Sequence, residues 1–266
     1  MTERIGIIGV GAMGSALLKG LLGGVAGPEM LLIADANPPV LKEAAEEYGV
    51  EARDVKGVAQ EADVVFIAVK PQDSKALLTD IAPFLRKDQV LVSLVAGLKI
   101  AAIEHSLASK TGVIRVMPNT PCLAGEGALA VSAGRYAGEK DIEKISGWLR
   151  QLGEVYHIPE KYMNAVTGLS GSGPAYVCLF IEALADGGVF AGLPRELAYR
   201  LAVQTVLGAA KMVRETGEHP AMLREKVTSP AGTTAAGLYE LEKGAFRSLL
   251  QRAVLKAAEK SREMGI

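Results

Sequence analysis

The segment Ile5-Gly6-Ile7-Ile8-Gly9-Val10-Gly11-Ala12-Met13-Gly14 decides the fold of the N-terminal half. It places a Gly-x-Gly-x-x-Gly motif directly after an apolar strand and before a predicted helix, Ser15 to Leu22. In dinucleotide-binding folds the first glycine permits a tight turn, the second lets the pyrophosphate approach the backbone, and the third packs helix on strand. The phosphates then lie at the helix N-terminus. We therefore predict that a dinucleotide binds here, at Ile8, Gly9, Gly11, Ala12, Met13 and Gly14. The alternative is that the segment is only a structural turn.

Up to residue 158, short β-branched runs alternate with helical stretches. Most of these runs are continuously apolar, which is typical of strands buried on both faces of a parallel sheet. The predicted strands are Ile5 to Ile8, Met30 to Ala34, Val64 to Val69, Val90 to Val95, Val113 to Met117, Ala128 to Ser132 and Val155 to Ile158. Predicted helices between them include Pro39 to Tyr48, Asp73 to Phe84 and Glu139 to Leu152. The alternation predicts an α/β fold, a Rossmann-type doubly wound parallel sheet over residues 1–158.

From residue 159 to 266 the β-branched runs largely disappear, and Ala, Leu and Glu dominate. We predict helices over Pro174 to Phe190, Pro194 to Glu215, Pro220 to Lys226 and Phe246 to Met264. Three of them open with a proline, which suits the first helical turn. The second domain is therefore predicted to be all-α.

The composition limits the classes of partner. The 266 residues carry 29 Lys+Arg against 30 Asp+Glu, a net charge of −1, which argues against a nucleic-acid or anionic-membrane surface. The apolar run Ala175 to Ile181 is far shorter than the roughly 20 residues of a membrane span, so we expect a soluble, cytoplasmic protein. Cys122, Cys178 and the scattered histidines fit no metal-ligand spacing, so no metal site is expected.

Asp35 closes the second predicted strand, where an acidic residue commonly binds the adenosine ribose. A carboxylate there repels a 2′-phosphate and so favours NAD over NADP. The alternative is that Asp35 caps the turn into Asn37-Pro38-Pro39. The phosphate state of the cofactor stays open at this point.

Small or turn-forming residues follow three later predicted strands, as a nicotinamide-ribose crevice requires. They are Ala68-Val69-Lys70-Pro71, Ala96-Gly97 and Met117-Pro118-Asn119-Thr120-Pro121. We expect Ala68, Val69, Lys70, Pro71, Ala96, Gly97 and Asn119 to line this crevice, although Lys70 fits a solvated surface charge equally well. Asn37, in the turn after Asp35, is a further expected cofactor-binding residue.

In the second half, two clusters of small and hydroxyl residues precede helices. They are Gly168-Leu169-Ser170-Gly171-Ser172-Gly173-Pro174-Ala175-Tyr176 and Ser229-Pro230-Ala231-Gly232-Thr233-Thr234. Backbone N–H groups and hydroxyls at a helix start suit an anion such as a carboxylate. The alternative is a pair of well-capped interhelical turns.

The layout of a Rossmann domain followed by helices resembles the β-hydroxyacid dehydrogenases, which use a lysine as acid/base for an alcohol. Gly168, Gly171 and Gly173 match that family's motif, but Val177 and Phe180 stand in place of its lysine and asparagine. A protonated C=N bond is already electrophilic and needs only positioning and a donor. The missing base therefore points to an imine substrate.

The stretch from Val227 to Glu242 resembles the signature of the pyrroline-5-carboxylate reductase family. Thr167 to Tyr176, the crevice segments and the glycine loop are similar to that family in the same order. The resemblance implies NAD(P)H-dependent reduction of 1-pyrroline-5-carboxylate to L-proline. It implies that Gly232 to Thr234 hold the substrate carboxylate and that Thr234, the catalytic candidate, bonds the ring nitrogen. Ser229, Gly232, Thr233, Thr234 and Ser172 are the expected substrate-binding residues.

The resemblance also implies a homodimer or larger homo-oligomer built by interleaving helical domains. Family members lean toward NADPH and often carry an asparagine ahead of the fourth strand, where this chain has Arg53-Asp54-Val55. With Asp35 this leaves NADH or NADPH open, although Arg53 offers charge to a 2′-phosphate. The alternatives are a related imine or small keto- or hydroxy-acid reductase, and a dinucleotide-sensing protein without turnover.

Overall fold

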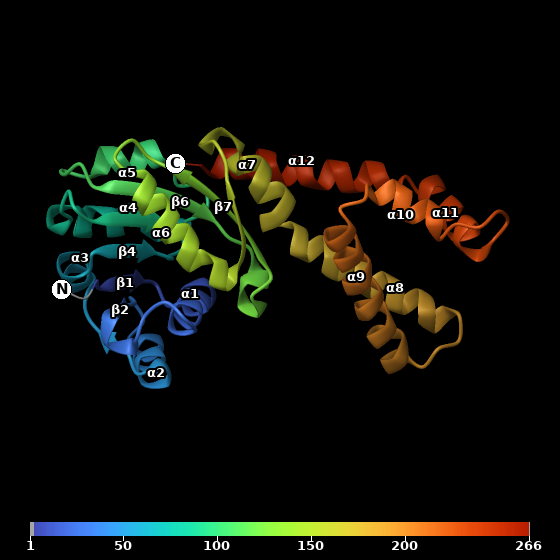
Figure 1. Cartoon of the computed structure of the whole chain (residues 1–266), viewed down its shortest axis with the longest axis horizontal. Coiled ribbons are helices and arrows are strands. Elements are labelled where there is room, and N and C mark those ends of the chain that lie inside the picture. Colours follow the sequence, from blue (N-terminus) through green and yellow to red (C-terminus); the bar gives the residue numbers. More distant parts are fainter. Residues whose placement is uncertain (1–2, 266) are drawn as a thin grey trace. The chain divides into compact units, whose positions relative to one another are not determined.

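The computed structural model describes residues 3–265 and groups them into two compact units (Figure 1). Residues 3–172 and 256–265 form the first unit, and residues 173–255 form the second. This division differs from the predicted boundary at 158–159. Arg115 Nη1 and the Ile100 N–H both donate to Glu160 Oε1, at 2.9 and 2.8 Å. Ser261 Oγ donates to Asn164 Oδ1 at 3.0 Å, so both flanking segments are tied to the first unit.

Within the described residues, the first unit holds one eight-stranded sheet with the order β3-β2-β1-β4-β5-β6-β7-β8. The strands are β1 (Ile5–Ile8), β2 (Leu31–Ala34), β3 (Glu51–Ala52), β4 (Val64–Ile67), β5 (Val90–Ser93), β6 (Gly112–Met117), β7 (Gly127–Ala133) and β8 (Gly153–His157). All pairs from β3 through β6 are parallel, which confirms the predicted doubly wound sheet.

The end of the sheet departs from the all-parallel prediction. Strand β7 runs antiparallel to β6, and β8 runs parallel to β7. The connection 118–126 carries only the short helix η3 (Thr120–Ala124). A parallel return needs a crossover of a dozen or more residues, so this connection permits only a reversal.

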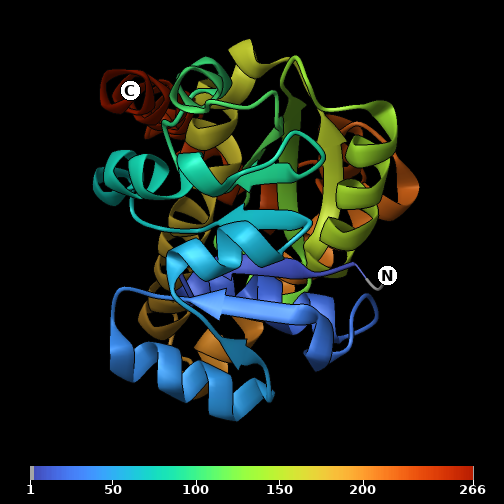
Figure 2. The same ribbon diagram turned by 90° about the vertical axis from the view of Figure 1, so that its left-hand side faces the viewer.

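Helices cover both faces of the sheet (Figure 2). The helices are α1 (Ala12–Leu22), α2 (Pro38–Tyr48), α3 (Val55–Glu61), α4 (Pro71–Ile81), α5 (Ile100–Ser106) and α6 (Glu139–Leu149). Alternate side chains of the strands enter two buried clusters, one with α1, α2 and α6 and one with α3, α4 and α5. Burial on both faces accounts for the continuous apolar strand sequences. The short β3, α3 and α5 were not predicted.

The second unit is all-α, as predicted. It holds α8 (Gly173–Phe190), α9 (Arg195–Thr216), α10 (Pro220–Lys226), α11 (Thr233–Lys243) and the first part of α12 (Phe246–Met264). The rings of Phe180 and Phe246 lie 5.9 Å apart and join α8 to α12 within this unit. A Cβ at Gly188 would lie 3.1 Å from Ala198 Cβ, so this glycine lets α8 and α9 approach closely.

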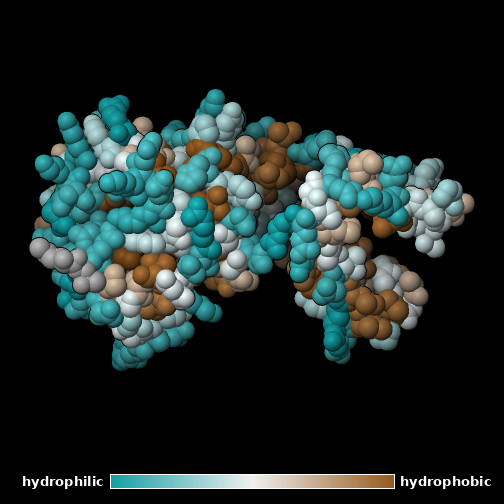
Figure 3. All heavy atoms as spheres, in the orientation of Figure 1, coloured by the Kyte–Doolittle hydropathy of each residue, from teal (hydrophilic) through white to brown (hydrophobic). Residues whose placement is uncertain are grey.

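One helical stretch is longer than the apolar run on which the membrane prediction was based. Glu160–Phe190, which includes η5 (Glu160–Tyr162), α7 (Met163–Val166) and η6 (Thr167–Gly171), is long and apolar enough to cross a bilayer by length and composition. Only 6% of its most apolar window is buried. The predicted run stopped at the charged Glu182, whereas α8 continues past Glu182 and Asp186 to Phe190. Hydrophobic side chains also lie exposed elsewhere on the second unit (Figure 3).

Candidate dinucleotide and anion sites

The glycine loop between β1 and α1 is a tight turn that only glycine fits at two positions. Gly9 has φ +95°, and its N–H donates to Ala34 O at 2.8 Å. A Cβ at Gly9 would lie 2.8 Å from Ala68 O, and one at Gly14 would collide with the Gly9 carbonyl oxygen. The first and third glycines therefore do what the motif requires of them: they make the turn and bring α1 against β1.

The middle glycine faces open space. Gly11 is the N-cap of α1, and a Cβ built on it would meet no atom within 4 Å. No side chain caps the helix, and its first turn holds no acidic residue. Gly11 and Ala12 are exposed. The loop therefore offers uncapped N–H groups and room for a phosphate to approach, so these residues fit a dinucleotide pyrophosphate.

Asp35 is held against this loop. Its Oδ2 accepts from the Val10 N–H and its Oδ1 from the Asn37 N–H, both at 2.8 Å. The second bond is the turn cap given above as the alternative to ribose binding. Because the first bond reaches into the glycine loop, the carboxylate also lies at the expected edge of the site.

Ala68, Val69, Lys70 and Pro71 follow β4 at the same edge of the sheet. The Ala68 N–H donates to Ile8 O at 2.8 Å, so this segment lies beside the glycine loop. Lys70 is the exposed N-cap residue of α4, and Pro71 occupies the first turn of the helix. The structure thus brings the first crevice segment and the glycine loop together.

Two other crevice residues, Asn119 and Gly97, have structural partners. The Asn119 side chain is buried, accepts from the Ala128 N–H at 2.9 Å and donates to Ser170 O at 3.1 Å. Gly97 has φ +79°, and a Cβ there would lie 3.3 Å from Met264 O. These contacts explain the asparagine and the glycine without a ligand.

The second hydroxyl cluster leads into α11. Ala231 has φ +55°, and the Gly232 N–H donates to Ser229 O at 3.0 Å, which closes the turn. Gly232 is the N-cap, with no side-chain cap and no acidic residue in the first turn. Thr233 and Thr234 are exposed. This helix N-terminus is therefore open to an anion, which argues against the alternative interpretation of a well-capped interhelical turn.

Ser172 and residues 229–234 lie in different units, the first and the second. The Ser172 N–H donates to Thr167 O at 2.8 Å and ends η6.

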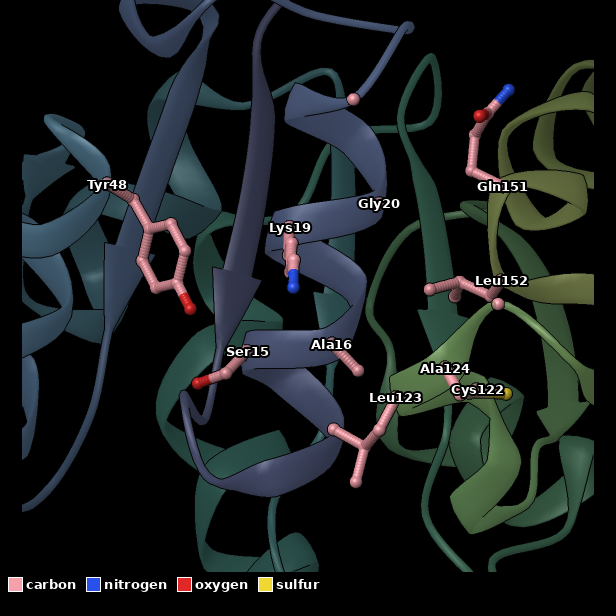
Figure 4. A pocket seen from close by; sticks show the side chains of 12 residues that line it. Ser15, Ala16, Lys19, Gly20, Tyr48, Cys122, Leu123, Ala124, Gln151 and Leu152 are labelled. Carbon is pink, nitrogen blue, oxygen red and sulfur yellow. The ribbon is translucent and has the colours of Figure 1, made fainter.

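A cleft of about 560 Å³ beside α1 was not predicted (Figure 4). Figure 4 shows Ser15 and Lys19 on α1, with Tyr48 on one side and Gln151 on the other. None of the predicted site residues lines it. Burial raises the pKa of the Cys122 thiol in its wall, so this cysteine is a neutral, unreactive group. No sequence motif marks this cleft.

The sheet and its open glycine loop define a dinucleotide-binding protein of the Rossmann class, here joined to an all-α unit. Residues 4–97 match the family model described as NADP oxidoreductase coenzyme F420-dependent. Residues 160–264 match the model for pyrroline-5-carboxylate reductase dimerisation.

Full-length relatives narrow the class to one family. The chain is 46% identical to pyrroline-5-carboxylate reductase of Arabidopsis thaliana, over 98% of this chain and 95% of the relative. It is 40% identical to that of Methanosarcina acetivorans, over 99% and 98%. The Plasmodium falciparum pyrroline carboxylate reductase with NADP bound superposes with a TM-score of 0.90 at 35% identity, covering 100% of this chain and 99% of the other. The chain belongs to the pyrroline-5-carboxylate reductase family.

Proposed function

We propose that this chain reduces 1-pyrroline-5-carboxylate to L-proline with NADH or NADPH. The observation that carries the proposal is family membership over nearly the full length, with 46% identity to a pyrroline-5-carboxylate reductase. The two uncapped helix N-termini, at Gly11 and Gly232, supply the matching chemistry. One suits a pyrophosphate and the other a substrate carboxylate.

The dinucleotide would be held by the glycine loop and the neighbouring strand ends. Gly9, Gly11 and Gly14 shape the turn, while Ala12 and Met13 offer first-turn N–H groups. Asp35 and Asn37 border the adenosine side, with Ile8 at the end of β1. When bound, the reduced nicotinamide supplies a hydride. Ala68, Val69, Lys70, Pro71, Ala96 and Gly97 are proposed to line the crevice, and Asn119 to position its loops.

The substrate carboxylate is proposed to bind at the start of α11. Backbone N–H groups from Gly232 to Thr234 would hold it, with the Ser229 hydroxyl as a further donor. Ser172, in the first unit, is separately proposed as a substrate-binding residue. The Thr234 hydroxyl would bond the ring nitrogen. Since the segment from Ser229 to Thr234 has no titratable side chain, we propose that the proton on that nitrogen comes from solvent and that orientation provides most of the rate.

The exposed apolar helices are proposed to pair with a second copy of the chain. The family model for dimerisation covers residues 160–264, which include the apolar stretch Glu160–Phe190. Leu179, Phe190, Leu201 and Leu207 are each at least half exposed in the single chain. Burying a fully exposed side chain of this kind is favourable by about 1.5–3 kcal/mol, and a half-exposed one gains about half of that. We further propose a cytoplasmic enzyme without nucleic-acid or membrane partners, in keeping with the net charge of −1.

Comparing ring sizes tests the substrate assignment. Purified protein is given the five-membered 1-pyrroline-5-carboxylate or its six-membered homologue, and oxidation of the reduced nicotinamide is followed. We expect the higher kcat/KM with the five-membered ring. A preference for the larger ring would favour a related imine reductase, and cofactor binding without turnover of either would favour a sensing protein.

A further inference from the structure

The carboxylate of Asp35 stands fixed at the edge of the site where the adenosine half of a dinucleotide would bind. We propose that this chain selects NADH over NADPH, because its adenosine subsite presents that carboxylate while the neighbouring cations are engaged by other partners. The inference rests on the proposed use of a nicotinamide dinucleotide and adds which of the two forms the site accepts.

The position of Asp35 is set by two backbone hydrogen bonds. The Val10 and Asn37 N–H groups, each 2.8 Å away, engage one carboxylate oxygen apiece. Each oxygen keeps capacity for another donor, so ribose hydroxyls can still bind. A 2′-phosphate carries a charge of about −1.5 to −2 at pH 7, offers mainly acceptors and is repelled by a carboxylate at this place.

Arg53 directly follows β3, the strand paired with the β2 strand that leads into Asp35. Strand β3 pairs with β2 so that Ala52 lies beside Ile33, and the Arg53 N–H donates to Ile33 O at 2.9 Å. Its backbone therefore lies at the level of the β2 carboxyl end, where Asp35 follows.

The Arg53 guanidinium is directed elsewhere. It forms ion pairs with Glu51 and with Glu61, the latter at 3.1 Å. Arg4 binds the same two carboxylates at 2.7 and 2.6 Å. Since Arg4 directly precedes β1, the shared carboxylates draw the Arg53 charge toward the amino end of the strands, away from the dinucleotide edge. Hydrogen bonding to Glu61 and Glu51 also raises the pKa of Arg53.

The next cations along the chain also have other partners. The turn from residue 36 to 41 has neither Lys nor Arg. Lys42 pairs with Glu46 on α2 at 3.7 Å, and Lys56 Nζ lies 5.9 Å from the centroid of the Phe84 ring. A 2′-phosphate would thus meet the Asp35 carboxylate without a preplaced compensating charge from these segments.

Binding of the two adenosine halves tests the proposal without any turnover. Calorimetric titration of the full chain compares ADP-ribose with 2′-phospho-ADP-ribose, which differ only in the 2′-phosphate. We expect ADP-ribose to bind about 10- to 100-fold more tightly. Asp35→Ser should lower the ratio of the ADP-ribose affinity to the 2′-phospho-ADP-ribose affinity at least several-fold. Asp35→Asn, which keeps the size of the side chain and one oxygen acceptor, should lower this ratio as well.

Asp63→Ser is the matched control. The Asp63 carboxylate also accepts a backbone hydrogen bond, from the Arg4 N–H at 2.8 Å, but it lies before β4 at the opposite edge of the sheet. This variant makes the same charge change and should leave the ratio as it is in the unaltered chain.

Equal binding of both ligands, or tighter binding of the 2′-phospho form, by the unaltered chain would overturn the proposal. The proposal would also be overturned by an Asp35 variant that unfolds at the same temperature as the unaltered chain and keeps the same ratio of affinities for the two ligands. If neither ligand binds, dinucleotide use itself is wrong and this inference falls with it. If ADP-ribose binds selectively but 1-pyrroline-5-carboxylate is not reduced, only the proposed reaction fails.

Discussion

Gly11→Ala separates the binding role of the glycine loop from its structural role. Gly11 has φ −68° and ψ −167°, which alanine also adopts, and the added Cβ meets no atom within 4 Å. The free energy of unfolding should therefore fall by only about 0.5–1 kcal/mol, the cost of alanine at an N-cap. The methyl group would instead occupy the space through which the pyrophosphate approaches. Losing one charge-assisted hydrogen bond weakens binding by about 1.5–3 kcal/mol, or roughly 10- to 150-fold.

The assay pairs calorimetric titration with ADP-ribose and urea unfolding. Gly147→Ala in α6 is the control, because its Cβ would also meet nothing within 4 Å. Replacing a glycine inside a helix should stabilise the fold by about 0.5–1 kcal/mol and leave affinity unchanged. If Gly11→Ala binds ADP-ribose as tightly as the unaltered chain, the loop does not hold the phosphates and the reasoning is refuted.

Three further outcomes are expected. Thr234→Ala should lower kcat/KM for 1-pyrroline-5-carboxylate about 10- to 100-fold through loss of one donor, and an unchanged value would remove Thr234 from the mechanism. Glu160→Gln should lower the free energy of unfolding by about 1–3 kcal/mol, because Arg115, with 5% of its side chain exposed, loses its counter-charge; urea unfolding with a change below about 0.5 kcal/mol would contradict this. Leu207→Lys should weaken the proposed dimer in sedimentation equilibrium, whereas Leu123→Lys, at similar exposure (58% against 55%), should not; equal effects would argue against an interface at α9.

Local sequence signals predicted the first unit in detail, because its strands are short apolar runs separated by clear turns. β1 and β4 begin where predicted. Outside the first unit, the predicted ranges of α10 and of α12, which spans both units, also match the observed ones. Strand β3 was not predicted because its two residues, Glu51 and Ala52, are both exposed and form no apolar run. The reversal at β7 was missed because a strand's apolar sequence does not encode its direction, whereas the length of the preceding connection constrains it.

Candidate site residues could be predicted where the backbone geometry permits only one type of residue. Gly9 and Gly14 are such positions, since a side chain there would strain the turn or collide. Asn119 was chosen for its place after a strand, but its amide is used by Ala128 and Ser170, a long-range pairing that no local pattern reveals. The orientation of Arg53 likewise depends on Arg4, Glu51 and Glu61, which meet only in the fold.

The most direct test of the central claim is to mix the purified chain with 1-pyrroline-5-carboxylate and equal concentrations of NADH or NADPH. Loss of the reduced-nicotinamide absorbance is followed while proline is quantified by mass spectrometry. We expect one proline formed for each dinucleotide oxidised, with the faster rate for NADH. Absence of proline with both dinucleotides would contradict the proposed reaction, and a faster rate with NADPH would contradict the role given to Asp35.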